Sequence, residues 1–163
     1  MALVIDDQVR EAWGRLTSTS HETALNWISC GYSAKGELEF RAEGRNGMQE
    51  FLDSLPADEI SWGAFLVTGV DDRGNTISRR PKYILLKYMP ETVPTMKRAR
   101  SGGHKGAVKQ IFDAHIDIEI EDKAELTEEV LIAKLRASGG AHAPNSYEFT
   151  PGVLIKVPDR GDA

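Results

Sequence analysis

The chain of 163 residues contains a single cysteine, Cys30, so no internal disulfide can form. One thiol within an apolar run is typical of a protein in a reducing compartment, and we expect Cys30 to be buried and unreactive. No apolar run reaches the length of about 20 residues that a membrane span needs. The N-terminus has neither a basic region nor a long apolar core, so it does not resemble a signal peptide. The sequence therefore predicts a cytoplasmic protein without membrane insertion.

Signatures of catalysis and of metal binding are also missing. The four histidines have no metal-ligand spacing and no cysteine partner, and no nucleophile motif is present. Residues 102–106 resemble a phosphate loop only faintly, because they lack the Gly-Lys-Ser/Thr order and follow helix-like residues. We expect His104 to face solvent and His115 to lie at a helix end, where a positive charge suits the helix dipole. The sequence predicts no enzyme activity, no metal and no cofactor.

Acidic side chains are scarce in one segment. Between Arg73 and Lys109 the chain has ten lysine and arginine residues and one acid, Glu91, although its net charge is −5. If this segment forms one surface, its field attracts an acidic partner that the overall charge does not reveal. The alternative is a solvated positive face with no partner, and composition does not decide between the two.

Hydrophobic periodicity predicts alternating helices and strands in one domain. We expect helices at about 6–18, 46–55, 94–114 and 122–138, and strands at 23–30, 38–43, 60–70, 77–89 and 116–120. The run Tyr83–Leu86 has little alternation, which places it in the sheet with both faces covered. This order predicts an α/β sandwich with a central mixed sheet of five to six strands, flanked by four or more helices.

The helix expected at 94–114 contains Gly102, Gly103 and Gly106. Because apolar periodicity resumes after them, we interpret the glycines as a bend and not as an end of the helix. In such a helix Arg98, Lys105 and Lys109 share one face, at spacings of seven and four residues. Carboxylates at 117, 119 and 121 alternate along the next strand, the usual pattern of a solvated face.

The last helix and the segment after it carry further signals. Asp122 and Glu125 resemble a capping box, and the helix that they start has an apolar face. That face consists of Leu126, Val130, Ala133 and Ala137. Residues 147–155 are too apolar for a solvated tail, so we expect part of this segment to pack back on the domain and pair along an exposed sheet edge.

Residues 82–94 resemble the central strand and following turn of the actin-depolymerising-factor/cofilin homology (ADF-H) domain. The resemblance continues through Arg98–Gly102, which reads Arg-Ala-Arg-Ser-Gly, to Ala137–Ala141, which reads Ala-Ser-Gly-Gly-Ala. Within this superfamily the similarity is greatest with the coactosins. The resemblance implies an ADF-H (gelsolin-like) domain at residues 1–142, followed by a C-terminal tail at 143–163 that is partly docked or flexible.

Two departures bear on the implied function. Cofilins carry a Lys-Met pair in the long helix, which inserts at the groove of an actin subunit, whereas this chain has Arg98 and Ala99. Cofilins also begin with a regulatory serine, where this chain has Leu3. Both departures point away from severing and from monomer sequestration. We therefore expect a monomeric protein of the cytoskeleton that binds filamentous actin, and binds monomeric actin weakly or not at all.

The family uses two surfaces, the long helix with the N-terminus, and a strand hairpin with the last helix. The cations expected to contact actin are Arg79, Arg80, Lys82, Lys97, Arg98, Arg100, Lys105 and Lys109. Lys82 is expected to begin the central strand, although Pro81 leaves the exact start open. Three alternatives remain: a cofilin-like severing factor, a module that binds phosphoinositides through the same basic surface, and a scaffold with no actin contact. Nucleic acid is not expected, because no motif is present and the overall charge is acidic.

Overall fold

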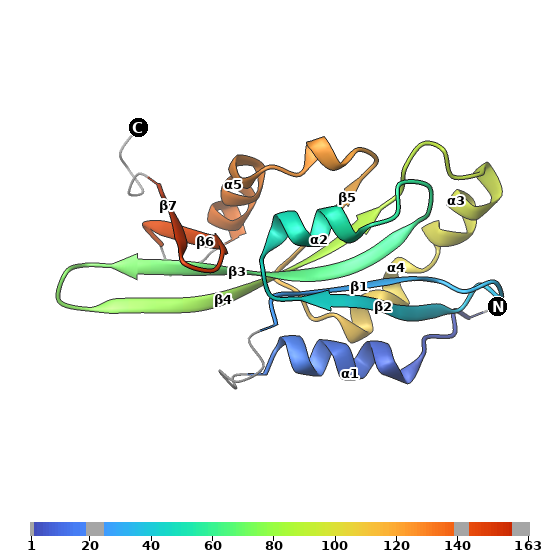
Figure 1. The fold of residues 1–163 in the computed structure, drawn as a ribbon, viewed down its shortest axis with the longest axis horizontal. Helices are drawn as coiled ribbons and strands as arrows, with labels where there is room; N and C mark the ends of the chain where they lie inside the picture. Colours follow the sequence, from blue (N-terminus) through green and yellow to red (C-terminus); the bar gives the residue numbers. More distant parts are fainter. Residues whose placement is uncertain (1, 19–24, 139–143, 158–163) are drawn as a thin grey trace.

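The computed structural model describes residues 2–18, 25–138 and 144–157, and a seven-stranded sheet forms its centre (Figure 1). One face of the sheet packs against α1 (Asp7–Leu16) and α4 (Lys105–Ile111), and the other against α2 (Met48–Ser54) and α5 (Glu128–Ser138). Helix α3 (Thr95–Gly102) lies at one end of the sheet. The chain is thus an α/β sandwich, as predicted, and the described sheet has seven strands where five to six were expected.

The strands pair in the order β2-β1-β3-β4-β5, and a C-terminal hairpin adds two more. Their bounds are β1 (Trp27–Tyr32), β2 (Leu38–Gly44), β3 (Ser61–Asp72), β4 (Ile77–Tyr88), β5 (Ile116–Ile120), β6 (Ser146–Thr150) and β7 (Val153–Lys156). Strands β4 and β5 are parallel, whereas the other pairs are antiparallel, so the sheet is mixed. The β6 strand pairs with β3 at Thr68–Val70, which confirms that the segment at 147–155 contributes to the sheet.

Strand β4 is buried on both faces where the apolar run predicted it. Ile84 and Leu86 pack with α2 and α5, while Leu85 packs with α1 and α4, and all three are at most 1% exposed. This alternation follows from the two-residue repeat of a strand. Cys30 is fully buried in β1, and burial raises the pKa of its thiol to about 12, as expected for an unreactive side chain.

The long helix breaks where a bend was predicted. Helix α3 ends at Gly102 and α4 begins at Lys105. The intervening His104 is half-buried, and its Nδ1 lies 2.8 Å from Tyr32 Oη, which accepts a hydrogen bond from Trp62 Nε1 at 2.9 Å. The predictions of a continuous helix and of a solvent-facing His104 are therefore wrong. The chain turns through Gly103 with an ordinary backbone conformation, and His104 then meets a partly buried polar partner that periodicity does not reveal.

The last helix starts later than predicted. The capping box of Asp122 and Glu125 is present, but it caps a 3₁₀ turn at Lys123–Glu125. Helix α5 begins after Thr127, whose Oγ1 accepts a hydrogen bond from the Val130 N–H. Because Leu126 precedes the helix, it does not set the helical phase. The buried face consists of Leu131, Ile132 and Leu135, whereas Val130 is 39% exposed.

Two predicted boundaries fall outside the described residues. They are the start of the first strand at Thr23–Ala24 and the end of the last helix at Gly139–Gly140. Within the described part of the chain, none of the helices has the length and apolar character needed to cross a membrane. The same residues contain no group of three His, Cys, Asp or Glu side chains that could hold a metal ion.

Candidate functional site

The eight predicted contact cations lie in two separate regions. We call the outer part of the β3–β4 hairpin, residues 68–81, the arm, and it projects from the body at the end opposite α3 (Figure 1). Arg79 and Arg80 lie on the arm and Lys82 lies at its base. The remaining five cations lie on the α3–α4 helix pair: Lys97, Arg98, Arg100, Lys105 and Lys109.

Strand β4 runs through Pro81, so Lys82 is the sixth residue of the strand and not its first. The N–H of Tyr83 donates to His115 Nδ1 at 2.9 Å, and the Tyr83 carbonyl accepts from the His115 N–H. The backbone polar groups of Tyr83 therefore point toward the edge of β4 that pairs with β5. Pro81, two residues earlier, faces the same side. Because β5 pairs with β4 only from Ile84 onward, that edge is open at Pro81 and the missing N–H costs no ladder bond.

His115 is not the charged helix-end residue that the sequence predicted. Helix α4 ends at Ile111, and Nδ1 of His115 accepts a hydrogen bond from the backbone N–H of Tyr83 in β4. Burial and the nearby charge of Lys82 lower the pKa of His115. The neutral imidazole is therefore the form that the fold favours.

On the arm, Arg80 and Lys82 share the face of β4 that carries Ile84, whereas Arg79 lies on the opposite face. Arg79 forms an ion pair with Glu148 of β6 at 2.7 Å. Arg80 and Lys82 form no ion pair with any residue that the structure describes. Burial of the Lys82 side chain and the charge of Arg80 lower the Lys82 pKa, so this ammonium lies beside a like charge with no acid to offset it.

One side of the helix pair is largely neutralised by β5 and the residue that follows it. Lys105 lies 2.7 Å and Lys109 3.4 Å from Asp117 carboxylate oxygens, and Arg98 lies 3.1 Å from Glu121. The hydrogen bond from Lys105 holds the pKa of Asp117 below its usual value. Arg98, Lys105 and Lys109 thus all reach carboxylates at 117 and 121, although they lie on two helices and not on the one helix that their spacing assumed. The acids, however, are ion-pair partners and not simply a solvated face.

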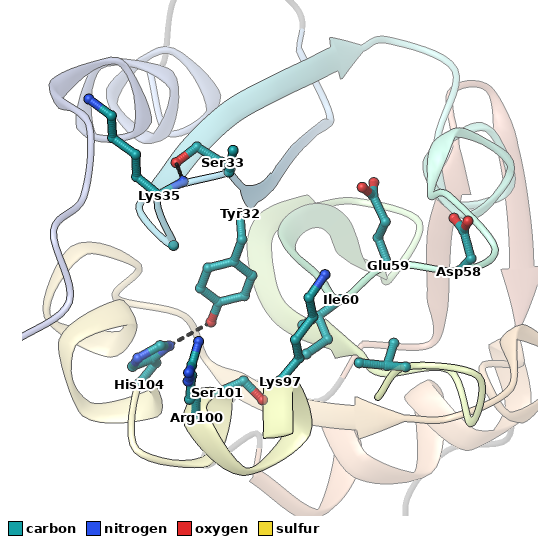
Figure 2. Close-up of a pocket in the computed structure, with 13 residues that line it drawn as sticks. Tyr32, Ser33, Lys35, Asp58, Glu59, Ile60, Lys97, Arg100, Ser101 and His104 are labelled. Atoms are coloured by element: carbon teal, nitrogen blue, oxygen red, sulfur yellow. Dashed lines mark hydrogen bonds between the residues drawn. The ribbon is translucent and has the colours of Figure 1, made fainter. Parts of the chain in front are cut away.

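The other side of α3 lines a cavity of about 260 Å³. Figure 2 shows Lys97 and Arg100 beside Tyr32 and His104, with the carboxylates of Asp58 and Glu59 across the opening. Lys97 and Arg100 are exposed and form no ion pair within the described residues. The cavity can therefore accept a polar group that approaches α3 from solvent.

The exposed surface of α3 also carries apolar side chains. Ala99 is exposed, as is Met96, whose exposed fraction of 67% is the largest among the exposed large apolar side chains. The two residues are three positions apart and lie on neighbouring turns of one helix face. The resemblance to the cofilins drew attention to Ala99, whereas Met96 was not among the residues predicted from the sequence.

Lys87, one of the ten cations of the basic segment, is not part of the surface. It is 6% exposed, and its Nζ lies 5.1 Å from the centre of the Trp62 ring and 3.8 Å from Glu119. Burial lowers the pKa of this lysine. Its position in the apolar run of β4 could have predicted this burial, because a strand that is covered on both faces buries every side chain.

Comparison with known proteins identifies the class to which this fold belongs. A family model described as cofilin/tropomyosin-type actin-binding protein matches residues 2–136. The human coactosin-like protein is 31% identical over 121 residues, which cover 74% of this chain and 81% of that protein. Coactosin of Dictyostelium discoideum is 26% identical over 144 residues, covering 86% of this chain and 94% of that protein.

A solved structure agrees with these relatives. The solution structure of mouse coactosin, described as an actin filament binding protein, has a TM-score of 0.68. It is 24% identical, and the match covers 86% of this chain and 95% of that one, which shows the same fold. The chain therefore belongs to the cofilin/tropomyosin-type family of actin-binding proteins and, within it, to the coactosins. It is an actin-binding protein and not an enzyme.

Proposed function

We propose that this protein binds along actin filaments through two basic patches and does not sever them. The observation that carries the proposal is the division of the eight cations. Arg80, Lys82, Lys97 and Arg100 have no acidic partner among the described residues, while the other four are ion-paired. Unpaired cations on separate regions of one molecule favour a large acidic partner that can reach both, as a filament does.

The non-severing part rests on the surface of α3. Ala99 stands where the cofilins have an apolar plug, and it offers one methyl group to a partner. Met96 lies about one turn earlier, so it would contact a partner at a different position along the helix axis than Ala99 does. Mouse coactosin is described as an actin filament binding protein, which supports the same mode for this chain.

The contacts set the strength of binding. Exposed ion pairs contribute about 0–1 kcal/mol each, so four unpaired cations give moderate affinity. Screening is strong beyond about 8 Å at physiological salt, so binding weakens as salt is added. In this role the protein acts as a monomer in the cytoplasm, associated with the cytoskeleton, and binds monomeric actin weakly or not at all.

Co-sedimentation with actin filaments at low and high salt tests the binding, and single-filament imaging tests the absence of severing. The protein should pellet with filaments at low salt, pellet less at high salt, and leave filament lengths unchanged. The variant Ala99→Met is the matched control, because it restores the apolar plug and should increase fragmentation or monomer binding. Absence from the pellet at low salt would refute the proposal, and rapid fragmentation by the wild type would refute its non-severing part.

Anionic phosphoinositide vesicles are a second candidate partner, because Lys35, Lys97 and Arg100 line one cavity at the surface. Vesicle flotation with and without filaments tests this candidate. If Lys97 and Arg100 serve both partners, vesicles should compete with filaments for the protein.

A further inference from the structure

The C-terminal β6–β7 hairpin lies outside residues 2–136, which match the family model. It therefore has no role assigned by that family. Its position in the sheet is specific, because β6 pairs with β3 only at Thr68–Val70. These residues belong to the arm that carries Arg79 and Arg80.

The arm has no other neighbouring strand in the described structure. Strand β1 pairs with β3 only at Ser61–Phe65, and β5 pairs with β4 only at Ile84–Tyr88. Without β6, the arm would be a two-stranded ribbon, which is marginally stable in water. Strand β6 thus adds a third strand to the arm. It pairs with the three β3 residues that pair on their other side with Arg79, Arg80 and Pro81 of β4.

Asn145 fastens the start of β6 to the arm. Its side-chain Oδ1 accepts from the Asp72 N–H at 3.1 Å, and its Nδ2 donates to the Asp72 carbonyl at 2.7 Å. Its backbone N–H donates to the Val70 carbonyl, and its carbonyl accepts from the Val157 N–H. One residue therefore joins the end of β3 to both strands of the hairpin.

The hairpin is in turn anchored in the body of the protein. Tyr147 and Phe149 are 1% and 2% exposed and pack in the core with α2 and α5. Between these two residues Glu148 points to the other face of β6 and pairs with Arg79 at 2.7 Å. The hairpin thus connects the core to the arm by burial on one face and by an ion pair on the other.

We propose that the β6–β7 hairpin positions the arm for actin, through Asn145 and through the Arg79–Glu148 ion pair. Arg79 is then a positioning residue, while Arg80 and Lys82, on the opposite face, contact the filament. This inference rests on the proposed filament binding. It assigns the C-terminal segment a part in that binding without direct contact between the segment and actin.

The full-length variant Asn145→Ala tests the contacts of Asn145 with the arm. Asn75→Ala is the matched control, since Asn75 lies at the exposed tip of the same arm. We expect Asn145→Ala to accelerate amide hydrogen exchange at 70–80 by about tenfold and to weaken filament affinity by roughly three- to tenfold. Protection in α1 and α3 should stay unchanged. Asn75→Ala should alter neither measurement.

Three outcomes would overturn the proposal. They are unchanged affinity with faster exchange in the arm, weaker affinity with unchanged exchange, and no change in either measurement. The second outcome would mean that the hairpin touches actin directly. If the wild type itself does not pellet with filaments, the proposed function fails, while the exchange measurement still reports whether the hairpin holds the arm.

A charge exchange tests the ion pair and covers the case in which Asn145→Ala does not fold. Arg79→Glu alone and Glu148→Arg alone place like charges together, whereas the double variant restores an attractive pair. The double variant should regain both arm protection and most of the filament affinity. Regained protection without regained affinity would assign Arg79 to the actin contact and overturn its positioning role.

Discussion

The arm and the α3–α4 helix pair are both rich in cations, but they hold them differently. On the helix pair, three of the five predicted contact cations are ion-paired with carboxylates at 117 and 121. On the arm, Arg79 is paired, whereas Arg80 and Lys82 have no acidic partner among the described residues. The charge available to a partner is therefore smaller on the helix pair than the sequence count indicates.

The difference follows from which strands lie nearby. Strand β5 runs parallel beside β4 and carries Asp117 to the helix pair that packs over it. The β5 strand does not extend to the arm, where β6 supplies a single acid, Glu148. Acids distant in sequence thus neutralise one basic region more than the other.

The largest expected effect concerns the support of the arm. Phe149→Ala removes an aromatic side chain that is 2% exposed, so it should lower the unfolding free energy by about 3–5 kcal/mol. Urea denaturation measures this change. Val153→Ala in β7, where the side chain is 54% exposed, is the control and should change stability by less than about 0.5 kcal/mol. Equal small effects would show that the hairpin is not docked in solution.

The next prediction separates an unpaired cation from a paired one. Lys82→Ala should weaken filament affinity about fivefold, or ~1 kcal/mol, because the Lys82 stem is held by the strand and its charge is not offset. Lys105→Ala should weaken it less than about twofold, because Asp117 already neutralises that charge. Both variants should keep the wild-type melting temperature within a few degrees. Equal losses in co-sedimentation would contradict the distinction.

Releasing the paired cations should make the two regions more alike. Asp117→Asn removes the carboxylate shared by Lys105 and Lys109, so filament affinity at low salt should rise about two- to threefold. The steeper salt dependence of this variant should bring its affinity back to the wild-type value at high salt. Asp53→Asn in α2 changes the net charge equally and is the control. A gain of the same size in the control would assign the effect to net charge.

The smallest expected effect is a pH dependence of stability. Burial, followed by Lys87 for His104 and by Lys82 for His115, lowers both pKa values from the ordinary 6.5. The unfolded chain then binds protons at a higher pH than the folded chain does. The contribution of these two histidines to the unfolding free energy should therefore be complete above pH 6.5. It should be lost as the pH falls through their lower pKa values in the folded state.

Urea midpoints between pH 5 and 7.5 measure this effect, and the double variant His104→Asn/His115→Asn should flatten the profile. A decline in the variant as steep as in the wild type would assign the pH dependence to other groups.

Local pattern predicted most of the fold. The alternation in residues 116–120 and the apolar run of β4 gave the strands, because a side chain's face in a strand depends on its position alone. The phase of α5 was wrong, since Leu126 belongs to a turn and not to the helix. The helix break at His104 was also missed, because His104 contacts Tyr32, a residue distant in sequence.

By itself the sequence determined the order of strands β1 to β5 and of the helices between them apart from the break between α3 and α4, the burial of Cys30 and the basic character of residues 73–109. All of these depend on residue types and their spacing along the chain. The resemblance carried by residues 82–102 and 137–141 led to the actin-binding family. Only the tertiary structure decided which cations are offset, that Lys87 is buried, and that β6 pairs with the arm. Ion pairs and strand pairing depend on distances between residues that are far apart in the sequence, and spacing along the chain does not determine those distances.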